Sequence, residues 1–153
     1  MNINNIKATF GYLGFMPFAF LSITPWVAGG QLGNTAIVFQ LGYGAVIISF
    51  LGGMSWGWRD NQANQPYNLF LGIIFSLSGC VILLLTYFNN ILLALLVSVI
   101  IFQSFYHFEK SSEDFLNKDD DYKKFRKILS LLVSISFLIS SAYWINPYSN
   151  PLT

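Results

Sequence analysis

The residues of this sequence whose types could support chemistry are few, and five of them lie at or beside the ends of long apolar segments. They are Ser55, Arg59, Asp60, Gln103 and His107. If the helix that carries Arg59 and Asp60 continues, the two side chains diverge by about 100°, so Arg59 can face inward and bind helix C-terminal carbonyls. Asp60 could then pair with His107. We treat this candidate polar cluster as a structural hypothesis and not as a catalytic site.

No grouping of residues predicts a catalytic centre, a metal site or a cofactor. His107 is the only histidine and Cys80 the only cysteine, so the chain offers neither a pair of axial haem ligands nor a pair of thiols. An interfacial polar role for His107 is favoured over a ligand or proton-relay role. Cys80 stands in an apolar run, where a packing role is favoured. We therefore expect that the protein is not an enzyme.

The composition explains why so little chemistry is available. Of the 153 residues, 54% are hydrophobic and only 10% are charged, whereas a soluble domain carries roughly 25% charged residues. The charges are also segregated, because residues 8–58, 61–108 and 128–153 contain none. This distribution excludes a globular enzyme, a nucleic-acid-binding protein and a disordered chain. It indicates a protein that crosses a membrane several times.

Five apolar windows are long enough to cross the bilayer as helices, which takes about 20 residues. They cover residues 8–28, 36–57, 67–88, 91–108 and 128–145. Gly29, Gly30, Gly33 and Asn34 are expected to separate the first two windows. The pair at residues 89–90 predicts a tight turn that makes the third and fourth helices antiparallel neighbours. The predicted fold class is all-α: one integral membrane domain, built as a bundle of five transmembrane helices.

The basic residues predict the orientation of this bundle. With five spans, all eight Lys and Arg residues fall on the side that holds the N-terminus and the segments at 58–66 and 109–127. Cytoplasmic segments carry the excess of Lys and Arg, so the N-terminus is predicted in the cytoplasm and the C-terminus outside. The predicted location is the bacterial inner (plasma) membrane, with the mitochondrial inner membrane as the alternative.

The segment before the last span is predicted to be a cytoplasmic amphipathic helix at about residues 112–127. Tyr122, Phe125 and Leu129 fall on one helical face, with four basic residues beside them. A helix of this kind is expected in the anionic headgroup layer of a membrane.

The second window contains a stripe of small residues. Ala45, Ser49, Gly53 and Gly57 recur every four positions, which lets another helix backbone approach closely. A central packing helix is favoured over the lining of a ligand site or pore. A leucine at Gly53 is therefore expected to harm the protein more than a leucine at Gly33, which is predicted to lie in a loop.

Three stretches of the chain resemble a family of bacterial and mitochondrial membrane proteins. They are GYLGFMPF at 11–18, LGYGAVIISFLGGMSWG at 41–57 and YKKFRKILSLLVSISFL at 122–138. The resemblance is to a domain of unknown function that is shared with a human mitochondrial transmembrane protein. It implies a multi-span inner-membrane protein and implies no activity. The family pattern has histidine before Trp-Gly, where this chain has Ser55. The resemblance therefore implies no metal, haem or proton chemistry at this position.

Three functions are compatible with the sequence, and the first two are favoured over the third. The first is a non-enzymatic accessory or assembly component of a membrane complex, with the lipid bilayer and other membrane-protein subunits as partners, no nucleic acid, and self-association left open. The second is a transporter or channel for a small, uncharged solute, lined by Gln40, Gln103 and the stripe of small residues in the second window. The third is an enzyme or cofactor carrier that uses His107 with Arg59 and Asp60. The lack of ionisable residues in the spans argues against a proton-coupled transporter.

Overall fold

The computed structural model describes residues 3–58 and 65–147; for residues 3–8 it describes the backbone alone. All regular structure in these ranges is helical. The elements are α1 (Ile3–Ala28), α2 (Gly30–Met54), the 3-10 turn η1 (Ser55–Gly57), α3 (Gln65–Tyr87), α4 (Ile91–Ser111), α5 (Glu113–Leu116) and α6 (Asp120–Ile145). In this part of the chain, five helices are long and apolar enough to cross a membrane: α1, α2, α3, α4 and α6. The prediction of an all-helical protein with five helices able to span a membrane is confirmed.

The turn between α1 and α2 is much shorter than predicted. Gly29 (φ 64°) and Gly30 (φ 48°) both adopt the left-handed backbone region, which glycine reaches without steric cost. These two residues reverse the chain by themselves, and α2 begins at Gly30. Gly33 and Asn34, which we expected in a loop, lie in the first turns of α2.

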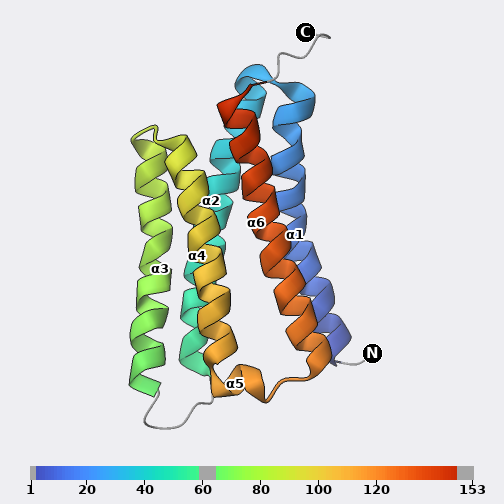
Figure 1. Ribbon diagram of the computed structural model, residues 1–153, viewed down its shortest axis with the longest axis vertical. Helices are drawn as coiled ribbons and strands as arrows, with labels where there is room; N and C mark the ends of the chain where they lie inside the picture. The colour runs from blue at the N-terminus through green and yellow to red at the C-terminus, as the bar shows by residue number, and fades with distance from the viewer. Residues whose placement is uncertain (1–2, 59–64, 148–153) are drawn as a thin grey trace.

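The hairpin between α3 and α4 forms where the sequence predicts it. Asn89 has φ 60°, a conformation that asparagine tolerates better than most residues. The backbone N–H of Asn90 donates to the Leu85 carbonyl at 2.9 Å and closes the end of α3. The two helices run antiparallel side by side (Figure 1).

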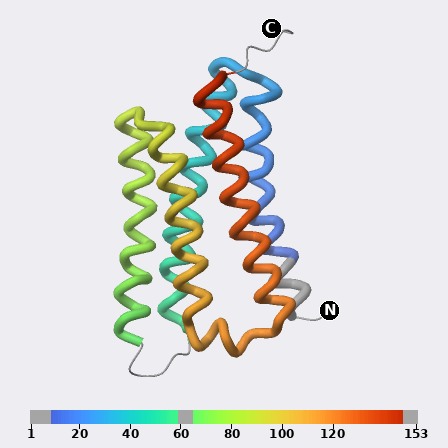
Figure 2. The backbone as a smooth tube through the Cα atoms, viewed as in Figure 1, coloured from blue at the N-terminus to red at the C-terminus, as the bar shows by residue number. Residues whose placement is uncertain are grey.

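Four helices surround the core, and the fifth lies outside them. In ring order, α1 contacts α2, α2 contacts α4, α4 contacts α6, and α6 contacts α1, while α3 packs against α2 and α4. The path of the chain can be followed in Figure 2, where α5 spans the gap between α4 and α6 at the end that carries the N-terminus. This crossing brings α6 back against α1.

One aromatic ring from each of the four central helices meets at the middle of the bundle. Phe18 of α1 lies with its ring centroid 4.9 Å from Tyr43 of α2, 5.9 Å from Phe102 of α4 and 5.5 Å from Phe137 of α6. Such aromatic pairs contribute roughly 0.5–1.5 kcal/mol each beyond the area they bury. Gly44 leaves room for this cluster, because a Cβ there would lie 2.7 Å from the Phe137 ring.

Helices α2 and α3 are joined by a line of small residues that differs from the predicted stripe. It consists of Ala45, Ser49 and Gly52 on α2 and Gly72, Ser76 and Gly79 on α3, and we call it the α2–α3 seam. The two serines cross-link the helices: Ser49 Oγ donates to the Ser76 carbonyl at 2.8 Å, and Ser76 Oγ donates to the Ser49 carbonyl at 3.0 Å.

The second half of the predicted stripe is wrong. A Cβ at Gly52 would lie 2.6 Å from the Gly72 carbonyl oxygen, whereas a Cβ at Gly53 or Gly57 meets no atom within 4 Å. The expected ranking of Gly53 and Gly33 is also reversed. Gly33 is buried, and a Cβ there would lie 3.1 Å from both Pro25 Cα and the Tyr143 hydroxyl.

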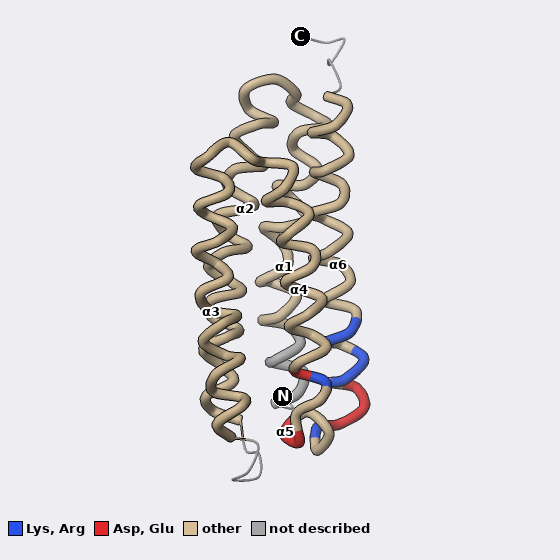
Figure 3. Tube along the Cα trace, turned by 60° about the vertical axis from the view of Figure 1, so that its left-hand side comes forward, with Lys and Arg blue, Asp and Glu red and all other residues tan. Residues whose placement is uncertain are grey.

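The charges gather at one end of the bundle. Figure 3 shows the Lys, Arg, Asp and Glu residues of the described chain at the end of α4, on α5 and on the first turns of α6. The opposite end, with the α1–α2 and α3–α4 turns, carries none in the described residues. Any chemistry that needs charge is therefore confined to this charged end.

Candidate functional site: a cavity at the charged end

The predicted polar cluster is not brought together among its described members. Ser55 Oγ donates to the Gly52 carbonyl at 2.8 Å and to the Asn68 carbonyl at 3.3 Å, between α2 and α3. Gln103 Nε2 donates to Ser134 Oγ at 2.7 Å, between α4 and α6. His107 is exposed on α4, beside the Tyr106 ring. Arg59 and Asp60 lie outside the described residues, so their predicted contacts stay predictions.

Two further polar residues differ from their expected surroundings. Gln40 is fully buried and joins α2 to α6, because it donates to Ser136 Oγ at 3.3 Å and accepts from Ser140 Oγ. Both of its partners are serine hydroxyls of α6. Cys80 is exposed on α3, so its predicted role as a packed core residue is wrong.

The most buried ion pair of the described chain is one that the sequence did not reveal. Arg126 on α6 donates from Nε to both carboxylate oxygens of Glu109 on α4, at 3.0 and 2.9 Å, and also from Nη2. The side chains expose only 6% (Glu109) and 11% (Arg126) of their surface. The pair therefore fixes the start of α6 against the end of α4 in a site that excludes most water.

A signal for this pair does exist in the sequence. Arg126 lies between Tyr122 and Leu129 on the apolar face of the segment, where an unpaired charge would be costly. The structure places this face against protein. Phe125 packs on Tyr12 of α1, with ring centroids 5.1 Å apart, and the Tyr122 hydroxyl lies 3.5 Å from Glu109. The predicted amphipathic segment is thus the short α5 followed by the first turns of α6, and its apolar face packs inside the bundle.

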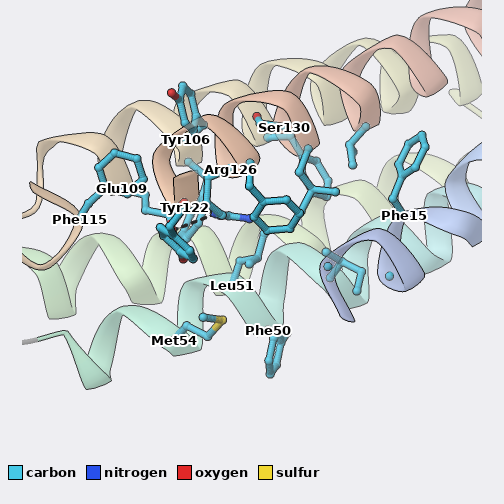
Figure 4. A pocket seen from close by; sticks show the side chains of 18 of the residues that line it. Phe15, Phe50, Leu51, Met54, Tyr106, Glu109, Phe115, Tyr122, Arg126 and Ser130 are labelled. Carbon is cyan, nitrogen blue, oxygen red and sulfur yellow. Dashed lines mark hydrogen bonds and ion pairs between the residues drawn. The ribbon is translucent and has the colours of Figure 1, made fainter. Parts of the chain in front are cut away.

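The ion pair lies in the wall of a cavity of about 690 Å³. This charged-end cavity opens between α1 and α2 on one side and α4 and α6 on the other. Most of its wall is apolar, including Phe15, Leu51 and Val133. Figure 4 shows Glu109, Arg126 and Tyr122 together at one end of it and Phe15 at the other. The volume lies within the roughly 300–1,000 Å³ of small-molecule sites.

A second ion pair lines the same cavity farther toward α5. Lys118 Nζ lies 3.0 Å from Asp114 Oδ2, one helical turn away in sequence, and both side chains are more exposed than the first pair. The charged lining therefore holds two carboxylates and two cations, which sum to zero. Ser112 holds α5 in place by accepting a hydrogen bond from the Phe115 backbone N–H at 3.2 Å.

One buried hydroxyl beside the cavity has no hydrogen-bond partner in the described structure. Ser130 exposes only 9% of its surface, and its hydroxyl makes no hydrogen bond in the described structure. Ser130 follows Arg126 by four residues on α6, so both side chains stand on one helical face.

The polar groups of the cavity are few and lie beside a mostly apolar wall. In the described ranges, no three His, Cys, Asp or Glu residues lie close enough together to hold a metal ion. Glu109 and Arg126 neutralise each other, and some N–H donors of Arg126 remain unused in the described structure. The rest of the cavity wall is mostly apolar. An amphipathic molecule matches this combination of an apolar wall and a polar end.

Comparison with known proteins places the chain in a family without assigning it a role. The model of the family described as "Protein of unknown function (DUF3429)" matches residues 4–142. The chain belongs to this family, which agrees with the resemblance found in the sequence. The comparisons with curated proteins and with solved structures gave no match.

Proposed function

We propose that this protein is a multi-pass membrane protein without enzymatic chemistry. It holds one amphipathic molecule in the charged-end cavity, and it acts as an accessory component of a membrane complex. The observation that carries the proposal is the apolar cavity of about 690 Å³ that ends at a buried ion pair. The described charges lie at one end of five apolar helices. The polar end of the cavity would then lie at headgroup level and the apolar wall beside the acyl chains.

The alternative of a transporter or channel receives less support from the same geometry. Gln40 and Gln103, its expected lining, are both engaged in hydrogen bonds between helices. The cavity wall includes Phe18 and Phe102, which pack with Phe137 at the middle of the bundle. A solute that entered from the charged end would meet this aromatic cluster.

Binding can be tested with two glycine variants that both have room for a side chain. Gly14 lines the cavity, and a Cβ there approaches only the Tyr43 hydroxyl, at 4.0 Å. Gly53 is exposed and open. After purification in mild detergent, native mass spectrometry should detect one bound lipid-sized molecule on the wild type and on Gly53→Leu. Gly14→Leu fills the cavity and should lower this occupancy roughly tenfold, which corresponds to a loss of about 1.4 kcal/mol. Equal occupancy in all three proteins would contradict the proposal.

The accessory role has its own readout in the same preparation. A stoichiometric second subunit that co-purifies with the tagged wild type would support it. A lone, monodisperse species that produces solute flux in liposomes would favour the transporter instead, and a coloured or redox-active preparation would favour a cofactor carrier.

We also propose that the charged end faces the cytoplasm of a bacterium, which places the N-terminus inside and the tail after Ile145 outside. The excess of Lys and Arg on one side supports this orientation. A reporter that is active only outside the cytoplasm should be active when fused after Thr153 and silent when inserted after Lys118. Activity at Lys118 would contradict the orientation.

A further inference from the structure

The charges of the charged-end cavity restrict the ligands that it can hold. Its lining contains Glu109 and Asp114, opposed by Arg126 and Lys118. A net charge is costly to place among apolar walls unless it is paired. Since the lining already sums to zero, the head of the ligand should carry no net charge. It can still carry one charge of each sign.

Arg126 retains donors that could bind the negative part of such a head. A guanidinium carries five N–H groups in a planar fork. Glu109 occupies Nε and Nη2, and no hydrogen bond from Nη1 is found in the described residues. Arginine binds phosphate oxygens with good geometry and strength, so a phosphate fits this position.

Asp114 adds a carboxylate to the same lining. It belongs to α5, lines the cavity together with Arg126, and pairs with Lys118 at 3.0 Å. The lining therefore combines carboxylates, a guanidinium with spare donors and a mostly apolar wall.

We propose that the charged-end cavity binds a zwitterionic phospholipid with a phosphate and a primary ammonium. The phosphate accepts hydrogen bonds from Arg126, and the ammonium lies near the Asp114 and Glu109 carboxylates. One acyl chain lies along the apolar wall. The two opposite charges of such a head match the carboxylates and the guanidinium of the lining, and its net charge of zero matches the sum of the lining. This inference rests on the proposed binding function and names the ligand class.

The lipid class can be tested by reconstitution into nanodiscs with equal amounts of phosphatidylethanolamine and phosphatidylglycerol, followed by native mass spectrometry of the released protein. The wild type is expected to retain phosphatidylethanolamine about tenfold over phosphatidylglycerol. Asp114→Asn should reduce this preference severalfold, because it removes a partner of the ammonium. Gly53→Leu, which lies outside the cavity lining, should retain the wild-type preference.

An Asp114→Asn variant that keeps the wild-type preference for phosphatidylethanolamine would overturn the assigned ammonium contact. Preferential retention of phosphatidylglycerol would overturn the lipid class while the binding function stands. Retention of no lipid by the wild type would overturn the binding function as well.

Discussion

Replacing Gly52 with leucine is expected to lower the thermal unfolding temperature of the purified protein by roughly 10 °C. A Cβ at Gly52 would lie 2.6 Å from the Gly72 carbonyl oxygen and from the Ser76 backbone nitrogen. Both are backbone atoms, so α3 must move away as a unit. Overpacking costs about 1–3 kcal/mol where side chains can adjust, and each kcal/mol corresponds to roughly 2–4 °C in a chain of this size. Rigid backbone on the far side places Gly52 at the upper end of that range.

Gly53→Leu is the matched control, because it adds the same side chain one residue away in the same helix. Its Cβ meets no atom within 4 Å, so the unfolding temperature should change by less than about 2 °C. Thermal unfolding in detergent, followed by intrinsic fluorescence, measures both variants. Equal losses at the two positions would show that α2 and α3 are not in contact along the α2–α3 seam.

The helix period explains why the sequence identified only half of this seam. Residues four apart are rotated by about 40° relative to one another, so a stripe at every fourth position winds around the helix. From Ala45, Gly53 is displaced by about 80°, and Gly57 lies beyond the end of α2, in η1. Gly52 follows Ala45 by seven residues and returns to within about 20° of it. Small residues alone could not distinguish the two stripes, because the crossing of α3 selects the face.

The spans and the α3–α4 hairpin could be predicted because they depend on properties of single segments. A window of apolar residues and the tight turn at residues 89–90 need no knowledge of neighbours. The cavity could not be predicted in this way, since α1, α2, α4 and α6 form its wall together. Its ion pair joins residues 17 positions apart across the α5 turn. The segment at 109–127 contains six acids and six bases, and only the fold selects Glu109 as the partner of Arg126.

Removing one partner of this ion pair is expected to destabilise the protein more than removing both. Arg126→Met leaves the Glu109 carboxylate buried without its counter-ion, and such losses cost about 3–5 kcal/mol. Glu109→Leu leaves the guanidinium in the same position and should cost a similar amount. The double variant replaces the pair by apolar side chains, which is often neutral or stabilising. Its stability should return to within about 1–2 kcal/mol of the wild type.

The more exposed Lys118–Asp114 pair provides the control for this experiment. Lys118 and Asp114 are also oppositely charged and 3.0 Å apart, but their side chains expose 38% and 19% of their surface. Exposed pairs contribute about 0–1 kcal/mol, so Lys118→Met should change the free energy of unfolding by no more than this. Reversible unfolding in mixed micelles gives the free energies for all four variants. If Arg126→Met costs no more than Lys118→Met, water reaches Glu109 freely. The polar end of the cavity would then be too well solvated to select a ligand by its charges.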